Sequence, residues 1–489
     1  MASEATPRQS PCSPTGIVLV AFTIGMVVLL AATSKIREFD PDEFQHLQIA
    51  WLIASGEIPY KSFFEHHTPL YHFVISPLLS NAALITDGNA AERMVIALRW
   101  IGVVLSVGIL ALTYLIAKML AGRLQALFAV ALTVSSLVFI KKAIEIRPDQ
   151  LALLLLLVST LTLALARESN WWRWCFLLSG ISATFAILTN QKAILALPGL
   201  ALTFCAVVAQ QRASARNILQ ACGIIVAASV ITAIPLLWYF WSHDALGDFV
   251  NSNFLIVAQW KHTSAVRRLL AIVFREDILI LFFAGLGLLD CLAQERPTSI
   301  WRLAVLAPFF SMALFMPIFP AVQYQYVLLM LPYLAILGGI GTAMAIKPLV
   351  ALRRPIIQFA LVVPVLALSV HALSLVADER SMRNSQTLET LRYVIEQTSP
   401  DSTVMTSWTP GIAFRKPAFF YLFLHPEIRF IIPEKAYASL AEGLRNRTVS
   451  PAVIEMDSNM KQLPSEILDL LMEGWEPTGI GNLWRRKTP

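Results

Sequence analysis

The segment Leu303–Ile346 reads LAVLAPFFSMALFMPIFPAVQYQYVLLMLPYLAILGGIGTAMAI and contains no charged residue. A helix that crosses a bilayer needs about 20 consecutive, mostly apolar residues, so this segment is long enough for two such helices. Pro317, Pro320 and the polar run Gln323–Gln325 mark the break between them, because proline interrupts a helix. The segment therefore predicts a pair of membrane-spanning helices.

The composition of the whole chain agrees with this prediction. Of the 489 residues, 56% are hydrophobic and 14% are charged, and the mean hydropathy is +0.64. A soluble globular protein carries about 25% charged residues. The composition excludes a water-soluble enzyme, a disordered protein and a disulfide-rich scaffold, and it predicts an all-α, multi-pass membrane protein.

Further apolar runs bring the total to about eleven predicted spans. Residues 1–15 are polar and rich in proline and serine, which predicts a disordered cytoplasmic tail, and residues 16–377 form the predicted transmembrane domain. The other runs are Ile17–Ser34, Trp100–Ala117, Leu124–Ile140, Gln150–Ala166, Trp174–Thr189, Ala193–Gln211, Asn217–Trp241, Ile278–Gln294 and Pro355–Ala377.

Cations in the turns between spans predict which side faces the cytoplasm. Suppose that the ambiguous apolar segment Pro69–Thr86 does not cross the membrane. The turns between spans on one side of the membrane then each carry at least two Lys or Arg residues, which is typical of cytoplasmic turns. We therefore expect Pro69–Thr86 to be a juxtamembrane helix. The cationic turns hold Lys118 and Arg123, Arg167 and Arg173, Arg212 and Arg216, Arg296 and Arg302, and Lys347, Arg353 and Arg354.

Four polar segments then share the extracytoplasmic face. They are the first outer loop (35–93), Lys141–Asp149, Ser242–Asp277 and the C-terminal region (378–489). The C-terminal region has an ordinary mixed composition, which predicts a small soluble α/β domain. Its predicted elements are a helix over Ser385–Gln397 and strands over Thr403–Trp408, Ile428–Ile432 and Ala452–Glu455.

The first outer loop concentrates the residues best suited to chemistry. It reads Phe39-Asp40-Pro41-Asp42-Glu43-Phe44-Gln45-His46 and later Phe63-Phe64-Glu65-His66-His67-Thr68-Pro69. A carboxylate beside a membrane is costly to ionise unless it is paired, which makes it a candidate base or metal ligand. Solvated interface residues would give the same pattern, so the residue types alone leave both interpretations open.

A second acid, Asp149, lies two spans further on and therefore on the same face. A carboxylate at the mouth of the following helix is favoured by the helix dipole, so Asp149 could serve only as a helix cap. The alternative is that Asp149 joins Asp42 in one extracytoplasmic site.

Cations gather at the same face, although outer loops are usually poor in Lys and Arg. They predict a cationic rim that suits the phosphate of a lipid, because Lys and Arg bind phosphate well. Solvated loop residues, or snorkelling in the case of Lys192, would account for the same charges. The rim residues are Lys141, Lys142, Arg147, Lys192, Lys261, His262, Arg267, Arg268 and Arg275.

Motif searches narrow the function class. The sequence contains no nucleotide-binding phosphate loop, no HExxH, no GxSxG and no dinucleotide-binding glycine pattern. Ion-coupled transporters usually carry ionisable residues near the bilayer midplane, whereas Asp290 is the main acid within the spans here. The pattern favours chemistry at the outer surface over transport.

The chemistry-bearing motifs resemble those of a known family. Pro41-Asp42-Glu43, Gly56-Glu57-Ile58-Pro59-Tyr60 and Phe64-Glu65-His66-His67-Thr68-Pro69-Leu70 are similar to motifs of the GT-C glycosyltransferases, nearest the protein O-mannosyltransferases and the lipid A aminoarabinose transferase. Arg147-Pro148-Asp149 and Thr189-Asn190-Gln191-Lys192 echo the resemblance, which covers roughly residues 15–345. It implies transfer of a sugar from a polyprenyl phosphate to an acceptor on the outer face of the membrane.

The resemblance also implies roles for individual residues. Asp42 matches the catalytic acid of the first loop and Asp149 the second acid, and Glu43 is a further catalytic candidate. Asp42 would take a proton from the acceptor, which would attack the anomeric carbon opposite the lipid phosphate and invert it. The expected donor-phosphate ligands are Lys192, Arg147, His67, Arg267 and Arg268.

A metal site is compatible with the resemblance, but no cofactor is required by it. Glu65 matches an acid that takes part in metal binding, and His262 would be its partner. The aminoarabinose transferase has a lysine next to the position of Glu65, where this chain has His66-His67, so His67 or Lys192 is expected to replace that phosphate contact.

The expected partners are a polyprenyl-phosphate-linked sugar and a lipid, glycan or protein acceptor, with no nucleic acid. The expected location is a bacterial inner membrane with the C-terminal domain outside. Two alternatives stay open: a transporter or flippase of a lipid-linked or polar substrate, and a membrane scaffold whose outer domain binds a partner.

Overall fold

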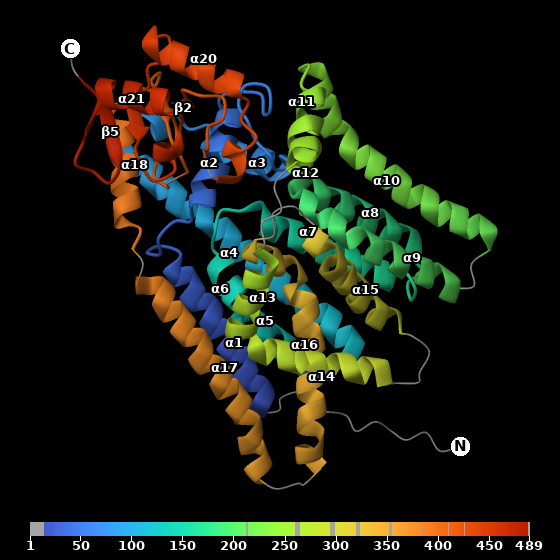
Figure 1. Cartoon of the computed structure of the whole chain (residues 1–489). Helices are drawn as coiled ribbons and strands as arrows, with labels where there is room; N and C mark the ends of the chain where they lie inside the picture. Colours follow the sequence, from blue (N-terminus) through green and yellow to red (C-terminus); the bar gives the residue numbers. More distant parts are fainter. Residues whose placement is uncertain are drawn as a thin grey trace, which may run out of the picture.

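The computed structural model describes residues 14–211, 214–259, 265–293, 299–318, 323–351, 355–381, 383–408, 410–424 and 426–487. Most of the predicted cytoplasmic tail (residues 1–13), Lys261 and His262 lie outside these ranges. The described chain is a bundle of long helices with a small mixed α/β domain at one end (Figure 1).

Every apolar run predicted to span the membrane contains a helix. Seven helices of the described chain are long and apolar enough to cross a bilayer, while α5, α14 and α15 are apolar but have 13 to 16 residues. The helices are α1 (Pro14–Thr33), α4 (Gly88–Ala121), α5 (Arg123–Ser135), α7 (Pro148–Leu165), α8 (Trp172–Thr189), α9 (Leu197–Gln210), α10 (Ala215–Ser242), α14 (Ile278–Ala293), α15 (Ile300–Phe315), α16 (Val327–Ala351) and α17 (Pro355–Ser381). The chain is a multi-pass membrane protein.

The first outer loop folds into short helices. They are α2 (Pro41–Ala54), α3 (Leu70–Ile75) and two single turns, η1 (Ser76–Leu79) and η2 (Ala82–Ile85). The segment Pro69–Thr86 is therefore broken into pieces, none of which reaches the roughly 20 residues that a span needs. The segment forms several turns instead of the one juxtamembrane helix that the sequence predicted, and its position along the membrane stays a prediction.

The segment between α5 and α7 packs closely against α4. It contains α6 (Leu137–Lys142) and the loop that leads to Arg147. A Cβ atom added to Gly102 of α4 would lie 2.9 Å from the backbone oxygen of Glu145, so only glycine lets this loop approach so near. Ser106, one turn later on α4, donates a hydrogen bond of 2.9 Å to the Ala143 carbonyl and fixes the same loop.

The C-terminal domain contains a five-stranded sheet in the order β2-β1-β3-β5-β4. β1 pairs in parallel with β2 and β3, and β5 pairs antiparallel with β3 and β4. The elements are α18 (Ser385–Gln397), β1 (Thr403–Met405), β2 (Lys416–Pro417), α19 (Pro426–Arg429), α20 (Glu434–Arg445), β3 (Val453–Glu455), η7 (Met460–Gln462), α21 (Ser465–Gly474), β4 (Trp475–Pro477) and β5 (Leu483–Arg486).

The predicted helix over Ser385–Gln397 is confirmed, and two of the three predicted strands contain β1 and β3. The prediction of a strand over Ile428–Ile432 is wrong, because α19 and a turn occupy that segment. Ile428 and Ile432 are nevertheless buried in the core of the domain, so the apolar pattern reports burial and not a strand.

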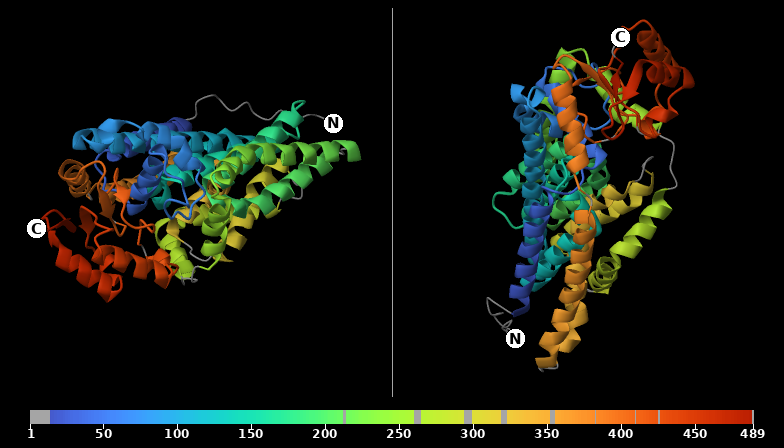
Figure 2. Two further views of the ribbon diagram at one scale, coloured as in Figure 1. Left: turned by 90° about the horizontal axis from the view of Figure 1, so that it is seen from above. Right: turned by 90° about the vertical axis from the view of Figure 1, so that its left-hand side faces the viewer.

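The first outer loop and the C-terminal domain lie at the same end of the molecule. Figures 1 and 2 show α2 and α3 beside this domain, together with α11 (Leu246–Val250), whereas the C-terminal end of α16 and the N-terminal end of α17 lie at the opposite end. Hydrophobic cores that combine Phe63 or Phe64 with residues of the C-terminal domain bind the two parts together.

Candidate functional site

Two acids from separate segments bind one arginine. Asp42 lies in the first turn of α2, and Asp149 lies in the first turn of α7. Arg147 Nη1 is 2.5 Å from Asp42 Oδ2, and Arg147 Nε is 3.1 Å from Asp149 Oδ2. The Asp149 side chain is only 2% exposed, whereas that of Asp42 is 18% exposed. The structure therefore brings the two predicted catalytic acids together around a shared cation.

The local sequence explains this placement. Arg147 has the extended conformation (φ −145°, ψ 148°) that a following proline favours, and Pro148 then opens α7. Asp149 lies in the first helical turn, where the helix dipole favours a carboxylate, but the residue that caps the helix is Arg147. Asp149 therefore does not serve as the N-cap, and its carboxylate binds Arg147 instead.

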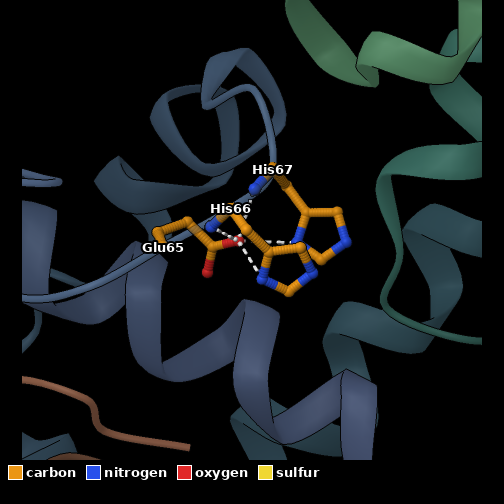
Figure 3. Close-up of side chains that lie close together, drawn as sticks. All are labelled: Glu65, His66 and His67. Atoms are coloured by element: carbon orange, nitrogen blue, oxygen red, sulfur yellow. Dashed lines mark hydrogen bonds and ion pairs between the residues drawn. The ribbon is translucent and has the colours of Figure 1, made fainter. Parts of the chain in front are cut away.

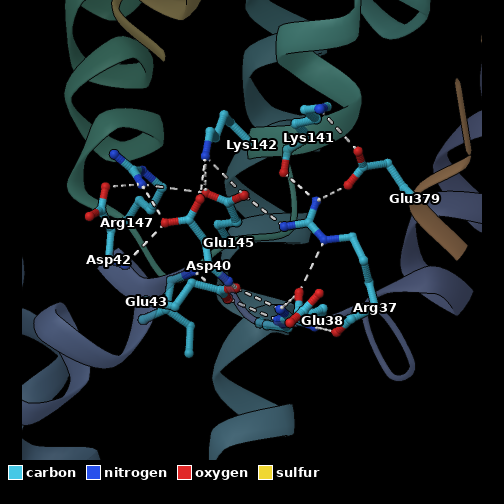
Figure 4. A network of polar contacts seen from close by, with 12 residues as sticks. Arg37, Glu38, Asp40, Asp42, Glu43, Lys141, Lys142, Glu145, Arg147 and Glu379 are labelled. Carbon is cyan, nitrogen blue, oxygen red and sulfur yellow. Dashed lines mark hydrogen bonds and ion pairs between the residues drawn. The ribbon is translucent and has the colours of Figure 1, made fainter. Parts of the chain in front are cut away.

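Arg147 belongs to a larger network of ion pairs (Figure 4). Its guanidinium also lies 3.6 Å from Asp40 and 3.5 Å from Glu145. Lys142 Nζ is 2.8 Å from Asp40 and 2.9 Å from Glu145, and Arg37 is 2.7 Å from Glu145. Burial opposes the ionisation of Asp40, but Lys142 and Arg147 outweigh it and hold the pKa of this carboxyl below its usual value.

Most of the predicted cationic rim is therefore compensated by acids. Arg147 and Lys142 bind the carboxylates described above, and Lys141 lies 3.3 Å from Glu379 of α17. Arg267 is exposed on α13 (Ala265–Glu276), and the side chain of Arg268 lies outside the described residues. The rim that the sequence suggested is mainly a network of ion pairs.

Glu43 is fully buried against Arg99 of α4. Arg99 Nη2 is 2.6 Å from Glu43 Oε1, and Arg99 Nε is 2.8 Å from Glu43 Oε2. Glu43 also accepts the backbone N–H of Asp40, which completes a capping box at the start of α2. Both side chains are 0% exposed. These contacts favour a structural role for Glu43. Arg99 directly precedes an apolar run, and no local pattern marked it as a partner of Glu43.

The segment Asn190-Gln191-Lys192 contacts both halves of the site. Asn190 Nδ2 donates to Asp149 Oδ1 at 3.0 Å, and Gln191 Nε2 donates to the His66 carbonyl at 2.6 Å. Lys192 Nζ lies 3.8 Å above the ring of Tyr326, which precedes α16. Among the described residues, no carboxylate lies within ion-pairing distance of this ammonium. Lys192 is thus a buried predicted phosphate ligand that, in the described part of the chain, forms no direct ion pair, unlike Arg147.

Glu65 organises the loop that follows Phe64 (Figure 3). Its Oε1 accepts the backbone N–H groups of His66 and His67 at 2.9 and 2.7 Å, and it lies 2.6 Å from His67 Nδ1. The Tyr60 hydroxyl donates to the His67 carbonyl at 2.6 Å. Burial and the nearby Lys192 hold the pKa of His67 well below its usual value, so the imidazole is neutral at pH 7.

Two further histidines pack behind this loop. His46 Nδ1 lies 3.0 Å from His72 Nε2, and the rings of His46 and His67 are 5.0 Å apart. Burial lowers the pKa of His72 to about 4 and holds that of His46 well below its usual value. The sequence placed these histidines in one loop but did not predict their contact.

Glu65, His66 and His67 offer ligand atoms within 4.8 Å of one another, a donor set that suits zinc. Glu65 Oε1 is already the acceptor for three N–H groups, so a metal would compete with these hydrogen bonds. The predicted partner His262 lies outside the described residues.

The comparisons with known proteins agree on the fold. Residues 81–239 match the family model of the dolichyl-phosphate-mannose-protein mannosyltransferases. No curated protein sequence matches the chain. The structure of ArnT from Cupriavidus metallidurans bound to undecaprenyl phosphate is similar over 92% of this chain and 94% of that one, with a TM-score of 0.63 and 14% identity.

The archaeal oligosaccharyltransferase AglB from Archaeoglobus fulgidus, in complex with an inhibitory peptide and a dolichol-phosphate, is similar over 95% of this chain and 74% of that one. Its TM-score is 0.55 and its identity 14%. At such identities a likeness establishes the fold. Together with the family match, these likenesses identify the fold of this chain as that of the GT-C superfamily of membrane glycosyltransferases.

Proposed function

We propose that this protein transfers a sugar from a polyprenyl phosphate to an acceptor at the extracytoplasmic face of a bacterial inner membrane. The observation that carries the proposal is the shared contact of Asp42 and Asp149 with Arg147, beside the ammonium of Lys192. Acids for proton transfer and a cation for phosphate thus meet at the end of the bundle that faces the C-terminal domain. The lipid phosphates bound to the two structural relatives support a lipid-linked donor.

In this proposal Asp42 is the base, because it is the more exposed of the two acids. Its carboxylate takes the proton of the acceptor hydroxyl or amine as the acceptor atom bonds to the anomeric carbon. The bond from that carbon to the phosphate oxygen breaks on the opposite face, so the anomeric centre inverts. Asp149, fixed by Arg147 and Asn190, orients the reacting groups.

The leaving phosphate gains negative charge as this bond breaks. Lys192 supplies a cation for that charge, and such electrostatic stabilisation is usually the largest contribution to catalysis. The Nδ1–H of His67 is already donated to Glu65, so the other ring nitrogen of His67 would donate to the phosphate only after protonation of the imidazole. A divalent ion at Glu65, His66 and His67 would add Lewis acidity at the same place. Nothing in the mechanism requires that ion.

The decisive experiment incubates the purified full-length protein with radiolabelled polyprenyl-phosphate sugars and a membrane extract, with and without a metal chelator. We expect a covalent product whose label has moved to a lipid, glycan or protein of the extract. Movement of the label across proteoliposomes without any covalent product would favour a transporter or flippase and overturn the proposal.

A further inference from the structure

The C-terminal domain holds the first outer loop at several points. The Gln48 amide of α2 binds the backbone of two consecutive residues in the domain: Nε2 donates to the Arg415 carbonyl at 2.6 Å, and Oε1 accepts the Phe414 N–H at 2.9 Å. Near the end of α2, Glu57 Oε1 lies 2.7 Å from Lys416 Nζ. The helix that carries Asp42 and the turn that follows it are therefore held to the domain at two points.

The backbone of Phe414 and Arg415, which Gln48 contacts, is itself held rigidly. Phe414 is fully buried and has a left-handed backbone (φ 60°), which is unfavourable for a bulky residue and persists only where surrounding contacts impose it. The buried guanidinium of Arg415 donates to the carbonyls of Ile395, Thr398 and Phe414 at 2.8 to 2.9 Å. The domain thus presents a fixed backbone to the loop.

Phe64 is the contact closest to the candidate site. Its backbone N–H donates to the Phe420 carbonyl at 2.9 Å, and its ring lies in the core of the C-terminal domain, 5.1 Å from the ring of Tyr421. The next residue is Glu65, whose carboxylate binds His66 and His67. Consecutive residues, Phe64 and Glu65, therefore belong to the domain core and to the site.

The membrane domain holds the other side of this loop. Gln191 Nε2 donates to the His66 carbonyl, and Thr68 Oγ1 donates to the Ile187 carbonyl of α8 at 2.8 Å. The loop from Phe64 to Thr68 is thus fixed between the C-terminal domain and α8. We propose that the C-terminal domain is a positioning element of the candidate site, and that Phe64 is the residue through which it sets the position of Glu65 and His67.

This inference gives the domain a role within the proposed transfer reaction, and its activity test rests on that reaction. A displacement of about 1 Å in groups that face a reacting bond can cost on the order of 100-fold in rate. Phe64 touches no reacting atom in the proposal, so it acts only through the residues that follow it.

The first test measures hydrogen exchange in the full-length protein. We expect Phe64→Ala to speed exchange of the peptide covering residues 64–68 at least tenfold, because the anchor of the loop is lost, while peptides from α7 and α8 keep their protection. Phe64→Leu retains an apolar anchor and should stay near the wild type. Met472→Ala, at an exposed position of α21, serves as the matched control. Unchanged exchange of residues 64–68 in Phe64→Ala would overturn the positioning role.

The second test measures transfer. Phe64→Ala should lower kcat at least tenfold and change the KM for the donor less than twofold, and Phe64→Leu should restore most of the rate. An equal loss in both variants would refute the positioning role. If the wild-type protein transfers no sugar, the proposed function fails, while the exchange measurement still decides whether the domain positions the loop.

Discussion

Asp42 and Asp149 bind two nitrogens of the same guanidinium, that of Arg147. The two acids are contributed by the N-terminal turns of different helices, and a third acid, Asp40, also lies near the arginine. A single guanidinium can do this because its planar fork presents several N–H groups at once. The arrangement fixes the two carboxylates relative to each other, as a base and an orienting acid require.

Replacement of the proposed base should abolish transfer without unfolding the protein. Asp42→Asn keeps the size of the side chain but cannot accept the proton, so we expect kcat to fall by about 100-fold or more. Glu38→Gln is the matched control, because Glu38 is an exposed acid of the same loop. Full activity of Asp42→Asn in the labelled-donor assay would refute the assignment of the base.

The shared guanidinium should not be replaceable by an ammonium. Arg147→Lys keeps the charge but loses the fork, so it can hold Asp42 or Asp149 but not both in their present geometry. We expect about a 10- to 100-fold loss of kcat with a near-normal thermal unfolding temperature. Arg147→Ala, by contrast, leaves buried acids uncompensated and should cost about 3–5 kcal/mol in the free energy of unfolding. Wild-type kinetics for Arg147→Lys would show that the bridge does not matter for the reaction.

Tyr326 should tune Lys192 through the face of its ring. A cation over an aromatic ring gains about 0.5–2 kcal/mol, which corresponds to roughly a 2- to 30-fold change in rate or affinity. Tyr326→Phe keeps the ring and should retain donor affinity, whereas Tyr326→Leu should weaken it within that range. Lys192→Gln should lose more, about 100-fold in kcat, because the proposed phosphate ligand itself is removed. Donor titrations of the three variants check the order, and equal effects of Phe and Leu at position 326 would contradict it.

The sequence predicted the main geometry of the site because that geometry follows from topology. Asp42 and Asp149 are separated by two spans and so must lie on one face, and Lys192 follows after two more. The eleven apolar runs likewise predicted helices, because a span needs a long apolar segment and leaves a clear pattern. These inferences need only the order of the segments and no knowledge of side-chain contacts.

Several residues that contact the site were not predicted, because their partners lie far away in the sequence and no local sequence pattern indicates such contacts. Arg99 borders an apolar run, and nothing near it signals that Glu43 will bind it. Tyr326 lies in a stretch that the sequence marked only as a break between helices. Gln48 and Arg415 are 367 positions apart, so no periodicity could relate them. The strand predicted over Ile428–Ile432 failed because an apolar run reports burial without specifying the backbone that buries it.

Glu43 and Arg99 should matter for stability more than for chemistry. Both side chains are fully buried, so Glu43→Ala leaves an uncompensated guanidinium and should cost about 3–5 kcal/mol in the free energy of unfolding. Glu92 pairs with Arg392 at a partly exposed position, so Glu92→Ala should cost about 1 kcal/mol or less. Thermal unfolding of the detergent-solubilised variants compares the two losses. If the Glu43→Ala protein is fully folded with normal stability but has no activity, the result would contradict the structural role and support a catalytic role for Glu43.

The buried histidines should make the protein lose stability as the pH falls. Burial lowers the pKa of His72 from 6.5 to about 4, so between these values the unfolded chain binds a proton that the folded protein does not. The resulting stabilisation is complete above pH 6.5, is lost as the pH falls toward 4, and amounts to about 3 kcal/mol. His72→Gln keeps a polar partner for His46 and should reduce the slope of unfolding free energy against pH in this window. His243→Gln, at an exposed histidine, should leave the slope unchanged. Equal slopes for His72→Gln and the wild type would show that His72 titrates in the folded protein as it does in the unfolded chain.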